Sequence, residues 1–187
     1  MENQILSALA ALEKLREGNK KYITATYPSG DISLIIRRET YDHGQTPYAV
    51  IVTCSDSRVI PESIFMTGIG ELFVIRVAGN IIGQHELGSI EYAASHLGAK
   101  LVVVLGHNRC GAVGAALNGE PEGFIRFITD EIREAIGGEK DEFRACCLNV
   151  QRSVSVIREN LTLSQENLKV CGAMYHIDSG EVEFFDE

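Results

Sequence analysis

Basic residues are scarce in this chain relative to acidic ones. Among 187 residues, 17 are Lys or Arg and 26 are Asp or Glu, so the formal net charge is -9. An excess of negative charge is poorly suited to binding nucleic acid or an anionic membrane, and no stretch of the sequence gathers basic residues into a patch. We therefore expect no nucleic-acid partner.

Long apolar runs are missing as well. No stretch reaches the roughly 20 apolar residues that a membrane-spanning helix needs. Residues 1–15 have helical apolar spacing, without the basic region or the small-residue cleavage site of a signal peptide. Internal repeats and low-complexity tracts are also absent from the sequence. We expect a cytoplasmic protein with no membrane partner, folded as one domain over residues 1–187.

The five cysteines are an odd number, which argues against a complete set of disulfides. In a chain without an export signal, we expect them to be reduced thiols. Three of them, Cys146, Cys147 and Cys171, belong to no metal-ligand pattern, and core packing is the simplest role for each.

Short apolar runs alternate with helical patterns from residue 49 onward. The runs predict strands at 49–52, 72–75, 101–105 and 168–175, with a hairpin partner at 182–185. Helices are predicted at 61–65, 84–97, 110–118, 123–136 and 141–160. Continuous apolar strands suit a parallel sheet that is covered on both faces. The pattern predicts a three-layer α/β domain with a mostly parallel central sheet and an antiparallel C-terminal edge hairpin.

The region before the first strand predicts a helical N-terminal arm over residues 1–40. Apolar side chains recur at helical spacing over 3–17, residues 22–30 are loop-like, and Asp31 is a candidate cap for a short helix through Arg38. The stripe of Ile5, Leu9 and Leu12 is separated from the first strand by this loop. We expect that stripe to cover a partner subunit.

Two short polar segments follow two of the predicted strands. The first contains Cys54, and the second contains His107 and Cys110. Strand ends at the carboxyl edge of a parallel sheet are where α/β proteins gather their sites. Two thiolates and one imidazole suit zinc, and three protein ligands leave a fourth position open, as in catalytic sites. Each piece alone is a weak signal, and a structural role for a single His or Cys is the more common case.

Asp56 and Arg58 follow Cys54 closely and have two interpretations. They are either a surface ion pair of little energetic value or a carboxylate held by a guanidinium beside the metal. In the second case Asp56 either orients a metal-bound water or itself occupies the fourth position. Two thiolates offset the charge of zinc, so its water should ionise above the value of about 7 that three imidazoles give. Asp56 is the only carboxylate in either segment placed to assist.

The sequence resembles the β-class carbonic anhydrases over nearly its whole length. The matching segments are CSDSRV at 54–59, ELFVIRVAGN at 71–80, SIEYA at 89–93 and GH followed by CGAV at 106–113. GAMY at 172–175 and GEV at 180–182 also match. The order of these segments along one chain is highly specific. It implies reversible hydration of carbon dioxide to bicarbonate and a proton, at a Zn²⁺ site.

The resemblance also implies roles for individual residues. Zinc would be bound by Cys54, His107 and Cys110, with Asp56 and Arg58 as a catalytic pair. Substrate would contact Gln45, Phe73, Tyr92 and the Gly111 amide. Tyr92 and His96 lie four residues apart and would transfer protons, although interface packing explains them equally well. The family implies a homodimer or a dimer of dimers with the active site at the subunit interface.

Other functions remain open at this point. Some relatives hydrolyse carbonyl sulfide or carbon disulfide at the same kind of site, and a zinc-binding protein without turnover is a third alternative. Nucleotide binding is disfavoured because no glycine-rich phosphate loop follows the first strand. The chain has no tryptophan. Family members that are inhibited by bicarbonate usually carry one where Ile51 stands, so we expect Asp56 to lie off the metal.

Overall fold

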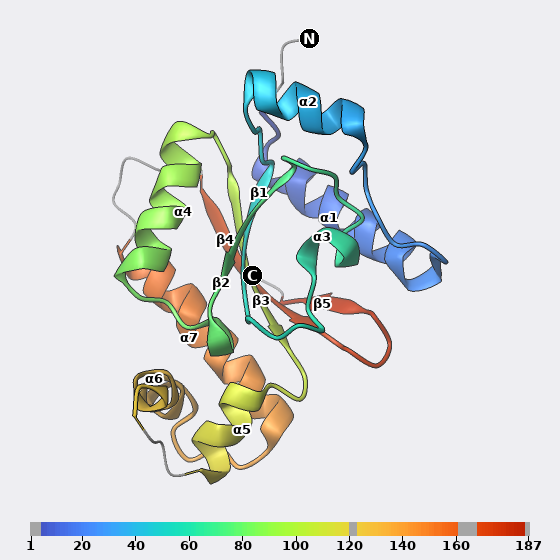
Figure 1. Cartoon of the computed structure of the whole chain (residues 1–187). Helices are drawn as coiled ribbons and strands as arrows, with labels where there is room; N and C mark the ends of the chain where they lie inside the picture. The colour runs from blue at the N-terminus through green and yellow to red at the C-terminus, as the bar shows by residue number, and fades with distance from the viewer. Residues whose placement is uncertain (1–4, 120–122, 161–167, 186–187) are drawn as a thin grey trace.

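Five strands form one sheet in the part of the chain that the structure describes, which is residues 5–119, 123–160 and 168–185 of a computed structural model. The strands are β1 (Ala49–Thr53), β2 (Leu72–Arg76), β3 (Leu101–His107), β4 (Lys169–Tyr175) and β5 (Val182–Phe184). Their order is β2-β1-β3-β4-β5, with parallel pairing throughout except for the antiparallel pair β4 and β5 (Figure 1).

Helices cover both faces of this sheet (Figure 1). One face carries α1 (Ala8–Thr24) and α3 (Pro61–Ile64), and the other carries α4 (Gln84–His96), α5 (Gly111–Asn118), α6 (Ile125–Ile136) and α7 (Glu142–Asn160). Alternate residues of one strand serve the two cores, since Val50 and Val52 belong to the α4–α7 side and Ile51 to the α1 side. The predicted three-layer α/β fold with its closing antiparallel hairpin is confirmed.

The N-terminal boundaries differ from those predicted. Helix α1 begins at Ala8, where the Ser7 side chain accepts a hydrogen bond from Ala10 N, and it continues through Thr24 into the predicted loop. Residues 3 and 4 of the predicted helix lie outside the described residues. The second helix, α2 (Leu34–His43), is capped by Ser33, whereas Asp31 accepts a hydrogen bond from the Ser33 amide. Two hydroxyl caps therefore set these helix starts.

Helix α1 is part of the domain body and not of a free arm. Leu12 and Leu15 are buried in the core cluster that includes Ile51. The prediction that Leu12 covers a partner is therefore wrong, while Ile5 and Leu9 are 63% and 69% exposed. Helix α2 has no buried residue and stands at the edge of the molecule (Figure 1). Within the described residues, no helix is long and apolar enough to cross a membrane.

Candidate metal centre

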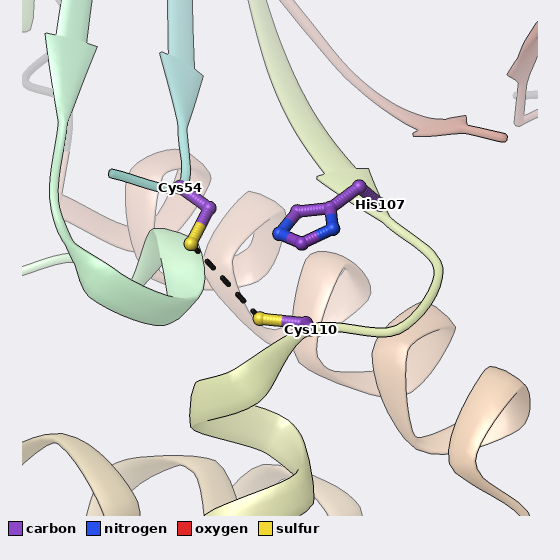
Figure 2. Close-up of side chains that lie close together, drawn as sticks. All are labelled: Cys54, His107 and Cys110. Atoms are coloured by element: carbon purple, nitrogen blue, oxygen red, sulfur yellow. Dashed lines mark hydrogen bonds between the residues drawn. The ribbon is translucent and has the colours of Figure 1, made fainter. Parts of the chain in front are cut away.

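Three ligand-bearing side chains converge at the carboxyl edge of the sheet. Cys54 directly follows β1, His107 is the last residue of β3, and Cys110 directly precedes α5. Their ligand atoms all lie within 4.8 Å of one another, and all three residues are buried (Figure 2). The Sγ atoms of Cys54 and Cys110 are 4.0 Å apart. The structure thus brings together the three ligands that the sequence predicts.

Sheet pairing explains this convergence. β1 and β3 are neighbours with Thr53 opposite Leu105, and the Thr53 hydroxyl donates to the Leu105 carbonyl at 2.7 Å. Parallel neighbours end at the same edge, so Cys54 and His107 emerge side by side. The short loop from His107 to Cys110 then returns the second thiol to the same place.

The geometry fits a tetrahedral zinc ion. In such a site, with Zn–S bonds near 2.3 Å, two sulfur ligands lie about 3.8 Å apart. The separation here is 4.0 Å. The Nδ1 of His107 is 2.8 Å from the Asn108 carbonyl, and its Nε2 is buried without a partner among the described residues. With Nδ1 donating to that carbonyl, Nε2 is left as a free lone pair directed toward the sulfurs.

The surroundings of the thiols favour negative charge. The hydrogen bond from Cys110 lowers the pKa of Cys54 to about 4, and the Gly79 amide, 3.3 Å from Cys54 Sγ, acts in the same direction. The same hydrogen bond raises the pKa of Cys110, because two adjacent thiols share one proton. A cation held between the two sulfurs would favour loss of that second proton. The donor set therefore suits a metal that takes thiolates.

Asp56 and Arg58 form a bidentate pair beside these ligands. Arg58 Nε donates to Asp56 Oδ1 at 2.9 Å, and Arg58 Nη2 donates to Oδ2 at 2.7 Å. The hydrogen bonds from Arg58 hold the pKa of Asp56 well below its usual range. Asp56 Oδ2 is also 3.9 Å from His107 Nε2. A charged carboxylate thus lies at the open side of the three ligands.

Comparison with known proteins agrees with this geometry. Residues 49–182 match the family model described as carbonic anhydrase. The chain is 37% identical to a carbonic anhydrase of Mycolicibacterium smegmatis, over 94% of this chain and 92% of that protein. Its fold is similar to the β-carbonic anhydrase CafA of Aspergillus fumigatus, with a TM-score of 0.71, 27% identity, and coverage of 95% and 90%.

A tetrameric β-carbonic anhydrase of Sordaria macrospora is also similar, with a TM-score of 0.66, 27% identity, and coverage of 82% of this chain and 92% of that one. The chain belongs to the β-class carbonic anhydrase family. The resemblance found in the sequence is therefore confirmed.

Two residues that support the loops of this candidate site had no predicted role. Arg76, at the end of β2, donates from Nε to the Cys54 carbonyl at 3.3 Å and from Nη2 to the Asp56 carbonyl at 2.7 Å. Arg109, with a φ of 54°, presents its carbonyl to Arg58 Nη2 at 3.1 Å. A cationic residue at the end of an apolar strand is a signal that would have pointed to Arg76. No sequence signal marks the backbone conformation of Arg109.

The other predicted residues of the β-carbonic anhydrase site fall into two groups. Gly111 directly follows the ligand Cys110 and begins α5. Gln45 precedes β1, at the end of the sheet opposite Cys54. Phe73 lies near the start of β2 and contacts Tyr92, with ring centroids 6.2 Å apart, and Tyr92 in turn contacts His96 at 5.4 Å. Within one chain, Gln45, Phe73, Tyr92 and His96 are therefore not brought to Cys54, His107 and Cys110.

Proposed function

We propose that this chain catalyses the zinc-dependent, reversible hydration of carbon dioxide to bicarbonate and a proton. The observation that carries the proposal is the buried group of Cys54, His107 and Cys110 beside a charged Asp56. Zinc bound by these residues would supply Lewis-acid activation of water for attack on carbon dioxide. Membership of the β-carbonic anhydrase family supports the same reaction.

The chain's own residues would orient the reactants. Asp56 can accept a hydrogen bond and stays ionised, because Arg58 holds its carboxylate in the bidentate pair. That pair would also hold Asp56 away from a metal bound by Cys54, His107 and Cys110, so that water could bind there. Gly111 is exposed at the first position of α5, where backbone amides point outward and suit an anion such as bicarbonate.

We propose a homodimer whose partner completes each site. β2 is an edge strand of the sheet, and α2 carries the exposed apolar side chains Leu34, Ile35 and Tyr41, which are 72–80% exposed. Antiparallel pairing of two β2 edges across a two-fold axis would place the start of one β2, which carries Phe73, near the end of the other, which carries Arg76. The substrate contacts predicted for Gln45, Phe73 and Tyr92, and proton transfer by Tyr92 and His96, would then occur at the partner's metal. Such dimers can pair further into tetramers.

A cytoplasmic location belongs to the same proposal. Cys54 and Cys110 lie close to each other as free thiols, without forming a disulfide. Thiols stay reduced in the cytosol, where zinc can use them as ligands.

Two measurements test the function. Elemental analysis of the purified chain should give one zinc per chain, and stopped-flow mixing with carbon dioxide should show zinc-dependent hydration. Hydrolysis of carbonyl sulfide or carbon disulfide is the alternative activity for a linear, apolar substrate, and the ratio of kcat/KM values separates it. A zinc-loaded chain that turns over none of these substrates would identify a zinc-binding protein without catalysis and refute the proposal.

A further inference from the structure

Asn108 follows His107 in the loop between β3 and α5, and all four of its polar groups have partners. Its backbone N–H donates to the Tyr175 carbonyl at 3.2 Å, and its own carbonyl contacts His107 Nδ1 at 2.8 Å. Its side-chain Oδ1 accepts from the Ile177 amide at 2.9 Å, and Nδ2 donates to Asp178 Oδ1 at 2.9 Å. The residue therefore joins the histidine ring to the turn between β4 and β5.

That turn is a fixed support. Asn19, buried on α1, donates to the Gly180 carbonyl at 2.9 Å and accepts from the Val182 amide at 2.9 Å. The turn is closed by the hydrogen bond from the Gly180 amide to the His176 carbonyl at 2.8 Å. Because α1 packs in the core, the atoms that hold the Asn108 side chain are tied to the body of the domain.

The position of the Asn108 carbonyl matters for His107. A donor hydrogen bond from Nδ1 fixes the tautomer and the rotation of an imidazole ligand, so that Nε2 is the nitrogen left for the metal. The Asn108 carbonyl is the partner of Nδ1, while the other ring nitrogen, Nε2, faces the ligand group and interacts with Cys54. If the carbonyl moves, the ring loses the contact that orients it.

We propose that Asn108 is a positioning residue for His107. Its side chain accepts a hydrogen bond from Ile177 and donates one to Asp178, and these two bonds set the orientation of the imidazole toward the metal. The inference rests on the proposed zinc site and adds a residue to it. The contacts of Asn108 are with His107 Nδ1, Tyr175, Ile177 and Asp178, so it would act on the metal site through His107.

The pairing with Asp178 offers a reciprocal exchange as a test. Asn108→Asp keeps the acceptor for the Ile177 amide but replaces the donor to Asp178 with a second negative charge. Asp178→Asn then supplies a donor amide to that new carboxylate, so the double variant restores one hydrogen bond in the opposite direction. Loss of an outer partner of a metal ligand typically weakens metal binding by about 10- to 100-fold. We expect zinc release from Asn108→Asp to be faster by that factor and the double variant to recover most of it.

The experiment measures zinc release from each zinc-loaded chain to a chromogenic chelator, and the ¹¹³Cd NMR chemical shift of each cadmium-loaded chain. Asn118→Asp is the matched control, because the side-chain hydrogen bond found for Asn118 among the described residues is to the Gly114 carbonyl of its own helix. Asn108→Asp should shift or broaden the ¹¹³Cd resonance, and the double variant should return it toward the wild-type position. The thermal midpoint of each metal-free chain reports any general loss of stability.

The outcomes separate this inference from the proposed function. Wild-type zinc release and an unshifted ¹¹³Cd resonance in Asn108→Asp would overturn the inference and leave the metal centre intact, whatever the thermal midpoint does. Fast zinc release in Asn108→Asp without recovery in the double variant would also overturn the inference. The hydrogen bond between side chains 108 and 178 would then have no effect on the metal site. A wild-type chain that takes up no zinc would overturn the proposed function itself, and this inference with it.

Discussion

The Asp56 carboxylate and the Arg58 guanidinium meet face to face through two contacts, of 2.9 Å and 2.7 Å, beside the group of Cys54, His107 and Cys110 that could hold a metal. Arg58 also donates to the Arg109 carbonyl at 3.1 Å, so one guanidinium joins the loop after β1 to the loop after β3. Planar two-point contacts restrict rotation of both partners. Arg58 thus fixes where the free face of Asp56 points.

Arg58→Ala tests this role. Without the guanidinium, Asp56 is free to turn toward the metal and to compete with water for the fourth position. We expect kcat for carbon dioxide hydration to fall by about tenfold or more, within the range found when a partner of an active-site group is removed. Arg144→Ala, which removes the ion pair of the exposed Arg144 with Glu139 near the start of α7, is the control and should leave kcat unchanged. An Arg58→Ala chain with wild-type kcat would contradict the assignment.

Removal of any one metal ligand should abolish stoichiometric zinc binding. Cys54→Ala, His107→Ala and Cys110→Ala each reduce three protein ligands to two, and elemental analysis after dialysis should then find well under one zinc per chain. Cys147→Ala is the control, because Cys147 is a free thiol on α7 outside the ligand group. Full zinc occupancy in one of the ligand variants would remove that residue from the set.

The sequence predicts the centre of this molecule better than its periphery. Cys54, His107 and Cys110 are predictable because apolar strands and the residues that follow them are local patterns, and parallel pairing then forces the strand ends together. The N-terminal helices are less predictable. Helix α1 extends through Thr24 because tertiary packing of its buried face against the sheet supports a segment that local signals leave as a loop.

Backbone geometry in the metal loop is also beyond the sequence pattern. Two glycines, Gly106 and Gly111, suggest that the loop bends there, yet Arg109 is the loop residue with a positive φ, of 54°. Gly106 is required for packing, because a Cβ at that position would lie 2.4 Å from Val150 Cγ2. Such contacts join residues far apart in the sequence, so they carry no local signal.

The pH dependence of hydration should separate the roles of water and Asp56. Two thiolates offset the charge of zinc, so the activated water should have a pKa above about 7, and activity should rise by about tenfold per pH unit below it. The lowered pKa of Asp56, caused mainly by Arg58, keeps the carboxylate charged at every pH in this range. A group with a lowered pKa contributes stability above its unfolded value of about 3.9 and loses it only in stronger acid. Asp56 keeps its charge from pH 6 to 9, so any change of rate in this range would come from the water. A flat rate profile would therefore exclude activation of water by the metal.

Stability should depend strongly on one glycine of α1. A Cβ at Gly18 would lie 2.0 Å from the Phe65 carbonyl oxygen, and the backbone cannot yield as a side chain would. Gly18→Ala should lower the free energy of unfolding by about 2 kcal/mol or more, as overpacking of a core does. Gly88→Ala, on the exposed side of α4 with no atom within 4 Å of the new Cβ, should be neutral or stabilising. Urea denaturation of both variants gives the comparison, and equal midpoints would show that α1 can move away from Phe65.

Gln45 and Cys54 lie at opposite ends of β1, so shared active sites can be tested by complementation between chains. Consider a heterodimer of a Cys54→Ala chain and a Gln45→Ala chain, with Gln45 of each chain acting at the partner's metal. One site then contains both substitutions, and the other site contains neither. The heterodimer, isolated through two different affinity tags, should show about half the wild-type kcat per dimer, while both variant homodimers are impaired. The matched control is the heterodimer of Cys54→Ala with Cys110→Ala, in which each chain has lost its own metal ligand, so neither arrangement leaves an intact site. If the first heterodimer is as inactive as this control, Gln45 does not act at the partner's metal, and the proposed two-fold sharing of substrate contacts is wrong.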